Sequence, residues 1–395
     1  MLYIKDKSVL KRLLLTIFTI IVIEVILGGG GRFLEVGPLS VRILIYLFII
    51  PLTLILIILA KGIDKTTAFW TIAFSLSLIL WSVIGFINNA NPLLLFEDIK
   101  PLSFFYVLPF FSFVIRSKDD LDYIIKIIKL STILMAIIYL IIILLLVFKI
   151  INFFTIYDIA KRSGEISFRN GILFFYKGFI YLCVGFFFCL LGKSKWDKFF
   201  AILLLVSIIL TLTRGFILAT ITGIIFYLIF INKNKLIGLL TLGAFIIMVA
   251  IITPLYMETI GDKSESDIIR YIQFDQVLER TNWINFFIGD GFGNGVPIRP
   301  IHMEISYLEI FTKQGILGLL FWGGLFSHVT FLFFSLNRNK NAFSYATPFF
   351  LSVFVIYVQS ATNPYLNNPI GLTMILISLT AINRIKNLEK KEHIL

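Results

Sequence analysis

Residues 196–231 read WDKFFAILLLVSIILTLTRGFILATITGIIFYLIFI, and this apolar run is too long for a single membrane crossing. As one helix it would extend about 54 Å, whereas the hydrocarbon core of a bilayer is roughly 30 Å thick. Lysines gather at both ends of the run, at Lys193, Lys195, Lys198, Lys233 and Lys235. A helical hairpin that turns at Thr213-Arg214-Gly215 would put both lysine clusters on the same side of the membrane. We therefore predict two spans here.

The composition of the chain extends this interpretation to its whole length. Of the 395 residues, 58% are hydrophobic and only 15% are charged, whereas soluble domains carry about 25% charged residues. Runs at 43–60 and 129–148 also reach the roughly 20 apolar residues that cross a bilayer as a helix. Backbone groups in lipid must pair internally, and these runs lack the alternation of a β-barrel. The sequence therefore predicts an all-α polytopic membrane protein.

We expect about twelve membrane-spanning helices, separated by short loops and one long polar segment. The predicted spans lie near 13–27, 43–60, 69–87, 101–115, 129–151, 172–191, 198–212, 215–231, 236–254, 315–335, 345–360 and 368–384. Residues 1–254 then hold transmembrane helices one to nine, and 255–314 form a large periplasmic loop with short helices. Residues 315–395 hold transmembrane helices ten to twelve and a polar cytoplasmic tail.

The positions of lysine and arginine predict the orientation of the chain. These residues concentrate in alternate loops, as expected for segments that stay in the cytoplasm. With both termini placed inside, the bias holds at every inner loop, and residues 255–314 fall on the outer face. The net charge of +12 is therefore explained by topology, and we expect no nucleic acid partner.

Several cations lie on the predicted outer side. Arg214 sits in the turn between two apolar helices, a costly place for a guanidinium unless it meets an anion or a wet cavity. The other candidates are Lys177, Arg270, Arg280 and Arg299. Because arginine makes bidentate contacts to phosphate oxygens, a group of such residues predicts a phosphate site. The alternative is that each side chain reaches lipid headgroups separately.

A glycine cluster, GDGFGNG at 289–295, lies in the same outer segment. It lacks the βαβ context in which such glycines bind nucleotides. One interpretation is a tight turn whose glycines adopt positive φ. The other is a set of backbone amides that approach a phosphate or a sugar.

His302 and Glu304 are the candidate general bases, because both lie in the outer segment just before the span that begins near Gly315. A solvated loop histidine is the simpler interpretation of His302 taken alone. The outer side contains no HExxH, CxxC pair or P-loop, so we expect no metal or other cofactor. Cys183 and Cys189 lie inside one apolar span and are predicted to be packing residues.

Four stretches in the second half of the chain resemble the O-antigen polymerase and ligase superfamily. They are FFIGDGFGNG at 286–295, HMEISYLEIFTKQGILGLLFW at 302–322, LTLTRGFILA at 210–219 and SDIIRYIQ at 266–273. The entry to the following span matches the superfamily pattern at Tyr307, Leu308, Glu309, Gly315, Ile316 and Gly318. Ligases of this superfamily usually carry a His-Asn pair where this chain has Glu304-Ile305, and this departure favours a polymerase.

The resemblance implies a lipid-linked oligosaccharide polymerase in the bacterial cytoplasmic membrane. Such an enzyme transfers a growing glycan, with inversion, from undecaprenyl pyrophosphate to a new lipid-linked repeat unit on the outer face. The donor carries its own leaving group, so the reaction calls for cations and a base. We assign pyrophosphate binding to Arg214 and Arg270, with Lys177, Arg280 and Arg299 as further candidates. Glu304 or His302 would be the base. Tyr307 would either stack on a sugar or, as the simpler interpretation, anchor the span at the membrane interface.

Two alternatives stay open. A ligase of the same superfamily would move finished glycan to lipid A core or protein. A flippase or secondary transporter would also have many spans, but such proteins place charged sites near the bilayer midplane and often carry inverted repeats. The expected partners are lipid-linked glycans, membrane lipids and a chain-length regulator protein.

Overall fold

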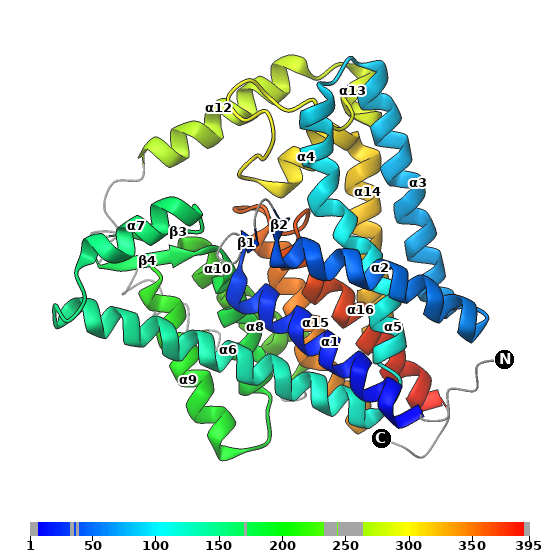
Figure 1. Cartoon of the computed structure of the whole chain (residues 1–395), viewed down its shortest axis with the longest axis vertical. Helices are drawn as coiled ribbons and strands as arrows, with labels where there is room; N and C mark the ends of the chain where they lie inside the picture. Colours follow the sequence, from blue (N-terminus) through cyan, green and yellow to red (C-terminus); the bar gives the residue numbers. More distant parts are fainter. Residues whose placement is uncertain are drawn as a thin grey trace.

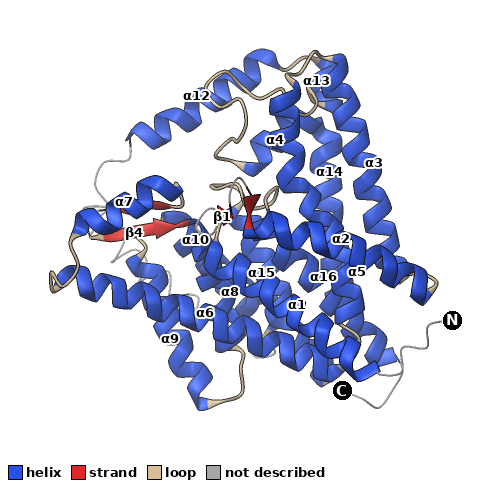
Figure 2. Ribbon diagram, viewed as in Figure 1, coloured by secondary structure: helices blue, strands red, loops and turns tan. Residues whose placement is uncertain are grey.

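The computed structural model describes residues 7–31, 35–36, 39–169, 172–232, 243 and 264–390. Helices dominate this part of the chain, and four short strands form two antiparallel hairpins (Figure 2). The first hairpin pairs β1 (Glu35–Val36) with β2 (Leu39–Ser40), and the second pairs β3 (Ile166–Arg169) with β4 (Leu173–Tyr176). The fold is therefore all-α with small β additions, as the composition predicts.

The helices of the first half are α1 (Lys7–Gly28), α2 (Val41–Ala60), α3 (Lys65–Ile87), α4 (Pro92–Leu102), α5 (Leu108–Val114), α6 (Lys118–Val147) and α7 (Phe153–Ser163). They are followed by α8 (Ile180–Leu190), α9 (Lys195–Leu210), α10 (Arg214–Phe226), α12 (Ser264–Arg280), α13 (Trp283–Ile288), α14 (Ser306–Phe334), α15 (Asn341–Gln359) and α16 (Pro369–Lys390).

Among the described residues, six helices are long and apolar enough to cross a membrane, which makes the chain a multi-span membrane protein. They are α2, α3, α6, α14, α15, and α10 together with the π turn at Tyr227–Ile231. The total of twelve spans and the three-part division of the chain remain predictions. The span predicted at 236–254 lies outside the described residues.

The predicted hairpin within residues 196–231 is confirmed. Helix α9 ends at Leu210 and α10 begins at Arg214, so the chain reverses within three residues. Leu212 takes a positive φ of 48° in this turn. The reversal puts Arg214 at the first position of α10, where the chain has just left α9.

The span predicted at 101–115 is not a single helix. It consists of the end of α4, a 3-10 turn at Ser103–Val107 and α5. Pro101 and Pro109 account for the interruption, because proline lacks the N–H that a continuous helix requires.

The span predicted at 172–191 is also wrong in its first part. Residues 173–176 form β4, in which Phe175 pairs with Ser167 of β3, and α8 begins only at Ile180. The stretch LFFY is rich in aromatic residues, which favour strands where a partner strand is available.

The centre of the bundle is built around α15, which packs against α8, α10, α14 and α16. Phenylalanine fills much of this core. The rings of Phe333 and Phe350 stack with their centroids 4.4 Å apart, for example. By contrast, α2 and α3 leave many large apolar side chains exposed, including Ile58 and Phe86. These two helices therefore present a surface suited to lipid.

The polar helix α12 and the short apolar helix α13 lie at one end of the molecule (Figure 1). The first turn of α1 and the last turn of α16 lie at the opposite end (Figure 1). Helices α3, α4 and α14 extend toward α13 (Figure 1), and α13 packs against α14. This arrangement agrees with the predicted parity of the spans, but the side of the membrane that each end occupies remains a prediction.

Cysteine labelling tests the orientation, because Cys183 and Cys189 are both buried. We expect Trp283→Cys in α13 to react with a membrane-impermeant maleimide in intact cells. We expect Lys193→Cys, between α8 and α9, to react only after the membrane is permeabilised. The reverse pattern would place α12 and α13 in the cytoplasm.

Candidate active site

Charged side chains of alternating sign form a continuous chain at the end of the molecule that carries α12. Nη2 of Arg214 lies 3.7 Å from Oδ2 of Asp267, and Oδ1 of Asp267 lies 3.3 Å from Nη1 of Arg270. Nε of Arg270 lies 2.9 Å from Oε2 of Glu304, whose Oε1 lies 3.4 Å from Nη2 of Arg299. We call these five residues the arginine chain.

The arginine chain joins segments that are far apart in the sequence. Arg214 begins α10, Asp267 and Arg270 lie in α12, and Glu304 and Arg299 precede α14. Arg270 also donates to the carbonyl oxygen of Thr362, 3.4 Å away, beyond the end of α15. The three arginine side chains are 32–46% exposed, so their charge is open to a ligand from solution.

Four other predicted site residues lie outside the arginine chain. Arg280 donates to the carbonyl oxygen of Gly295 at 2.6 Å. Lys177 lies 3.9 Å from a carboxylate oxygen of Glu165. The hydroxyl of Tyr307 donates to the carbonyl oxygen of Tyr357, so only its ring remains for a sugar. His302 belongs to a second cluster.

This second cluster is buried and centres on Lys313 of α14. The ammonium lies 2.7 Å from Oδ1 of Asp98 and 2.6 Å from Oε1 of Glu309. The three side chains are only 3–5% exposed. The second oxygen of Asp98 accepts from the backbone N–H of Gly293, and that of Glu309 accepts from the amide of Asn367. We call this group the lysine cluster.

The burial of the lysine cluster has electrostatic consequences. Removing ions from water costs several kcal/mol each, which is recovered only when every charge is paired and hydrogen-bonded. Burial accordingly raises the pKa of Asp98, although the Lys313 ammonium opposes that rise. Burial also raises the pKa of Asp290 in the nearby glycine turn, against the opposing charge of Arg280.

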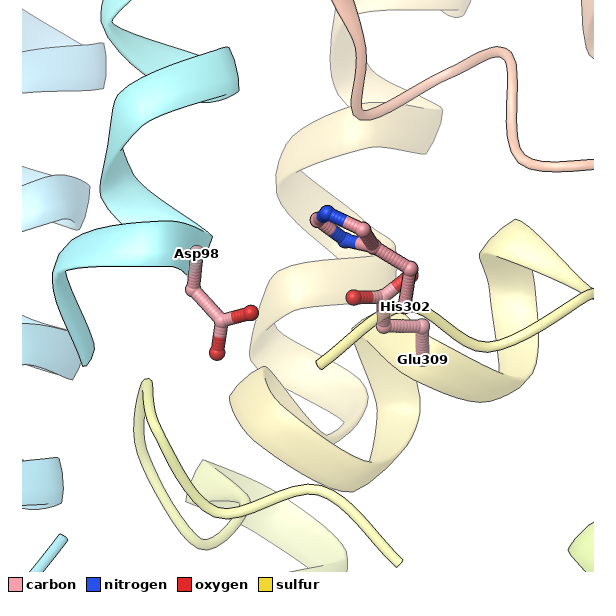
Figure 3. Close-up of side chains that lie close together, drawn as sticks. All are labelled: Asp98, His302 and Glu309. Atoms are coloured by element: carbon pink, nitrogen blue, oxygen red, sulfur yellow. The ribbon is translucent and has the colours of Figure 1, made fainter. Parts of the chain in front are cut away.

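Asp98, His302 and Glu309 converge in a way that could also hold a metal ion. Figure 3 shows the carboxylate of Asp98 facing the side chains of His302 and Glu309. Their ligand atoms lie within 4.8 Å of one another. However, the Lys313 ammonium already contacts both carboxylates and supplies the positive charge that they require. Exposed His302 lies at the edge of this cluster and Glu304 in the arginine chain, so the two candidate bases are separated.

The glycine cluster at 289–295 is a tight turn, as its first interpretation predicts. Gly289, Gly291 and Gly293 all have positive φ, between 70° and 85°. The N–H groups of residues 290 and 291 donate to the carbonyl oxygens of 312 and 313, and those of 292 and 293 donate to Trp81 and Asp98. These four amides are therefore occupied by protein acceptors, and the interpretation as a phosphate cradle is wrong for them.

Gly315 of α14 lies in backbone contact with this glycine turn. It interrupts the helix with φ 63° and ψ −162°, a conformation essentially restricted to glycine. A Cβ at Gly315 would lie 2.4 Å from the backbone of Phe287, and a Cβ at Gly289 would lie 2.4 Å from the backbone of Gln314. The two glycines thus allow the turn and the kinked helix to meet through backbone atoms.

Comparison with known proteins agrees with the resemblance found in the sequence. No protein-family model matches the chain. An O-antigen polymerase from Shigella flexneri is 29% identical over 393 residues, which cover 94% of this chain and 95% of the relative. The chain is a homologue of an O-antigen polymerase. The match includes nearly all of both proteins, so it extends well beyond the four stretches between residues 210 and 322 that carry the resemblance.

The structure of this O-antigen polymerase homologue also reveals a polar residue that sequence reasoning missed. Gln359, the last residue of α15, is 1% exposed, and neither atom of its amide has a hydrogen-bond partner among the described residues. A Cβ at Gly215 would lie 2.7 Å from its Nε2. An unpaired buried amide is costly, and this one lies against the residue that follows Arg214. A glutamine at the end of an apolar span carries no sequence signal for such a position.

The lysine cluster was likewise not predicted, although Glu309 and Lys313 stand at the i, i+4 spacing of a helical ion pair. Lys313→Met should lower the free energy of unfolding by about 3–5 kcal/mol, because it leaves two buried carboxylates without a cation. Thermal unfolding of the purified protein in detergent measures the loss. Lys100→Met, which removes an exposed pair with Glu97, is the control and should cost less than about 1 kcal/mol.

In the O-antigen polymerase homologue, the kink of α14 can be tested by substitution at Gly315. Gly315→Ala forces a side chain into a glycine-only conformation, at a cost of about 1–3 kcal/mol before the contact with Phe287 is counted. The Tm should therefore fall. Gly323→Ala, in the same helix with open space around its Cα, should leave the Tm unchanged or raise it. Equal Tm values for the two variants would contradict the role of Gly315.

Proposed function

We propose that the protein joins lipid-linked oligosaccharide repeat units into a polymer on the outer face of a bacterial cytoplasmic membrane. The donor is a growing glycan on undecaprenyl pyrophosphate, and the acceptor is a sugar hydroxyl of a new lipid-linked repeat unit. Full-length homology to an O-antigen polymerase supports this proposal. The observation that carries it is the arginine chain, which gathers three cations and two carboxylates at one exposed place.

The reaction forms a bond between the acceptor oxygen and the anomeric carbon of the donor sugar. It breaks the bond between that carbon and the pyrophosphate, which leaves with the bonding electrons. The acceptor hydroxyl loses one proton to a base. Negative charge therefore grows on the leaving pyrophosphate, and cations placed there lower the barrier.

Arg214 and Arg270 are suited to the pyrophosphate. Asp267 lies between them, 53% exposed, and holds both guanidinium groups with one carboxylate. A pyrophosphate carries more negative charge and more acceptor oxygens than this carboxylate, so it would displace Asp267 and bind both arginines. The amide of Gln359 beside Gly215 adds a donor that has no protein partner among the described residues. Lys177 and Arg280 would act further along the substrate.

Glu304 is the better placed of the two candidate bases. Arg270 bonds Asp267 through Nη1 and Glu304 through Nε, so the two carboxylates lie on different edges of one guanidinium. Pyrophosphate on Arg270 would loosen its bond to Glu304 and free a carboxylate oxygen to accept the proton. His302 lies instead beside Asp98 and Glu309. We therefore assign the base to Glu304, with inversion at the anomeric carbon.

The experiment is polymerisation by purified protein in liposomes, with synthetic undecaprenyl-pyrophosphate-linked repeat units as substrate. The wild type should give a ladder of products on a gel. Arg214→Ala and Arg270→Ala should each slow the reaction by roughly 10²–10³-fold. Glu304→Gln keeps a hydrogen-bonding side chain but no base, and should lose about 10²–10⁴-fold.

Arg162→Ala is the matched control, because Arg162 is an exposed arginine of α7 without an ion pair among the described residues. It should leave the ladder intact. A full ladder from Arg214→Ala and Arg270→Ala at normal protein levels would remove the pyrophosphate assignment. Failure to join repeat units, together with transfer of finished polymer to lipid A core, would identify a ligase instead.

A further inference from the structure

A polar cavity lies at the end of the molecule opposite to α12. It has a volume of about 350 Å³ and opens between the end of α2, the start of α3, the end of α5 and the last turns of α16. Its charged and amide-bearing lining residues are Lys61, Asp64, Arg116, Asn383, Arg384 and Asn387. This volume falls in the ~300–1,000 Å³ range of ligand pockets.

The positive charge of this cavity is only partly balanced by the protein. Within the described part of the chain, Lys61, Arg116 and Arg384 have no ion pair, because no carboxylate lies within 4 Å of their charged nitrogens. Arg384 donates through Nε and Nη2 to the carbonyl oxygen of Arg116. Arg116 places its guanidinium 5.0 Å from the ring centroid of Phe113. Neither contact removes a charge.

Two carboxylates lie near these cations, and both already have hydrogen-bond partners within the protein. Asp64 caps α3 by accepting from the N–H of Thr67 at 3.1 Å, and it accepts from the amide of Asn383 at 3.2 Å. Asp120 accepts from the N–H of Arg116, but its ion pair is with Lys11 at 2.7 Å. Three cations therefore surround the cavity against one lining carboxylate, which favours an anionic ligand.

Two of the helices that meet at the cavity, α2 and α3, expose large apolar side chains within a few residues of it in the sequence. Ile58 and Leu59 in the last turn of α2 are 74% and 58% exposed, and Phe69 in the first turns of α3 is 59% exposed. Both helices are apolar enough to span the membrane. A ligand held by the cations would therefore have hydrocarbon-compatible surface beside it, which suits an amphiphile rather than a small ion.

We propose that this cavity binds the phosphate headgroup of an anionic phospholipid. The phosphate would bind among Lys61, Arg116 and Arg384, with the acyl chains along the exposed surface of α2 and α3. Basic pockets between membrane helices are known to select such lipids. Cations that only contact lipid headgroups at the bilayer surface would each extend into solvent separately. These three cations instead line one cavity, together with the side-chain amides of two asparagines. The site is distinct from the arginine chain and does not depend on the proposed function.

Native mass spectrometry of the delipidated full-length protein tests the site, with added dioleoylphosphatidylglycerol as the probe. We compare the wild type with Lys61→Asn/Arg116→Gln. Asparagine suits the positive φ of 55° at position 61, and the bond from Arg384 goes to the backbone of residue 116. The double variant should bind the lipid roughly tenfold or more weakly. Its Tm without lipid should match that of the wild type, and Lys61→Asn alone should show an intermediate loss.

Lys193→Gln/Lys195→Gln is the control, because it removes the same charge between α8 and α9, outside the cavity. It should bind the lipid as the wild type does. Dioleoylphosphatidylcholine, which has no net charge, should not be retained. Equal retention of phosphatidylglycerol by the double variant, or of phosphatidylcholine by the wild type, would overturn the proposal. So would inorganic phosphate that raises the Tm as much as phosphatidylglycerol, because the ligand would then be a free anion.

Discussion

The pairing of one buried ammonium with two buried carboxylates constrains the whole end of the molecule that carries α12. Lys313 cannot stay charged away from water unless Asp98 and Glu309 remain within hydrogen-bonding distance. Asp98 belongs to α4 and Glu309 to the first turn of α14, and the Lys313 ammonium also contacts the carbonyl oxygen of Ile301. That contact lies three residues before Glu304, so the lysine cluster fixes the segment that delivers the carboxylate to the arginine chain.

The two charged clusters at this end differ in exposure and in how completely their charges are paired. The lysine cluster is closed, and its ammonium and both carboxylates have partners within the protein. The arginine chain is half-exposed, spans longer distances and includes one pair at 3.7 Å. A closed network supplies rigidity, whereas an open one keeps its charges available for exchange with a substrate. Rigid support close to an exchangeable site is what charge stabilisation of a leaving group requires.

The sequence predicts the parts of this architecture that follow from periodicity and length. The hairpin between α9 and α10 follows from an apolar run that is too long for one crossing. The presence of charged partners around Arg214 follows from the cost of placing a lone guanidinium between apolar helices. The broken helix at 101–115 and the strand at 173–176 depend on tertiary partners that local patterns do not show. The same is true of Gln359 and of the separation of His302 from Glu304, because both depend on how distant segments pack.

The backbone contact between the segments of Gly289 and Gly315 bears on which substitutions the fold can tolerate. The turn and the kinked helix touch through main-chain atoms that every amino acid shares, so their fit is independent of side-chain chemistry on either side. Two residues without a side chain therefore specify the angle at which α14 leaves the membrane region and presents its first turns. Side chains at neighbouring positions can therefore change in size and polarity while the backbone contact between the turn and the helix stays the same.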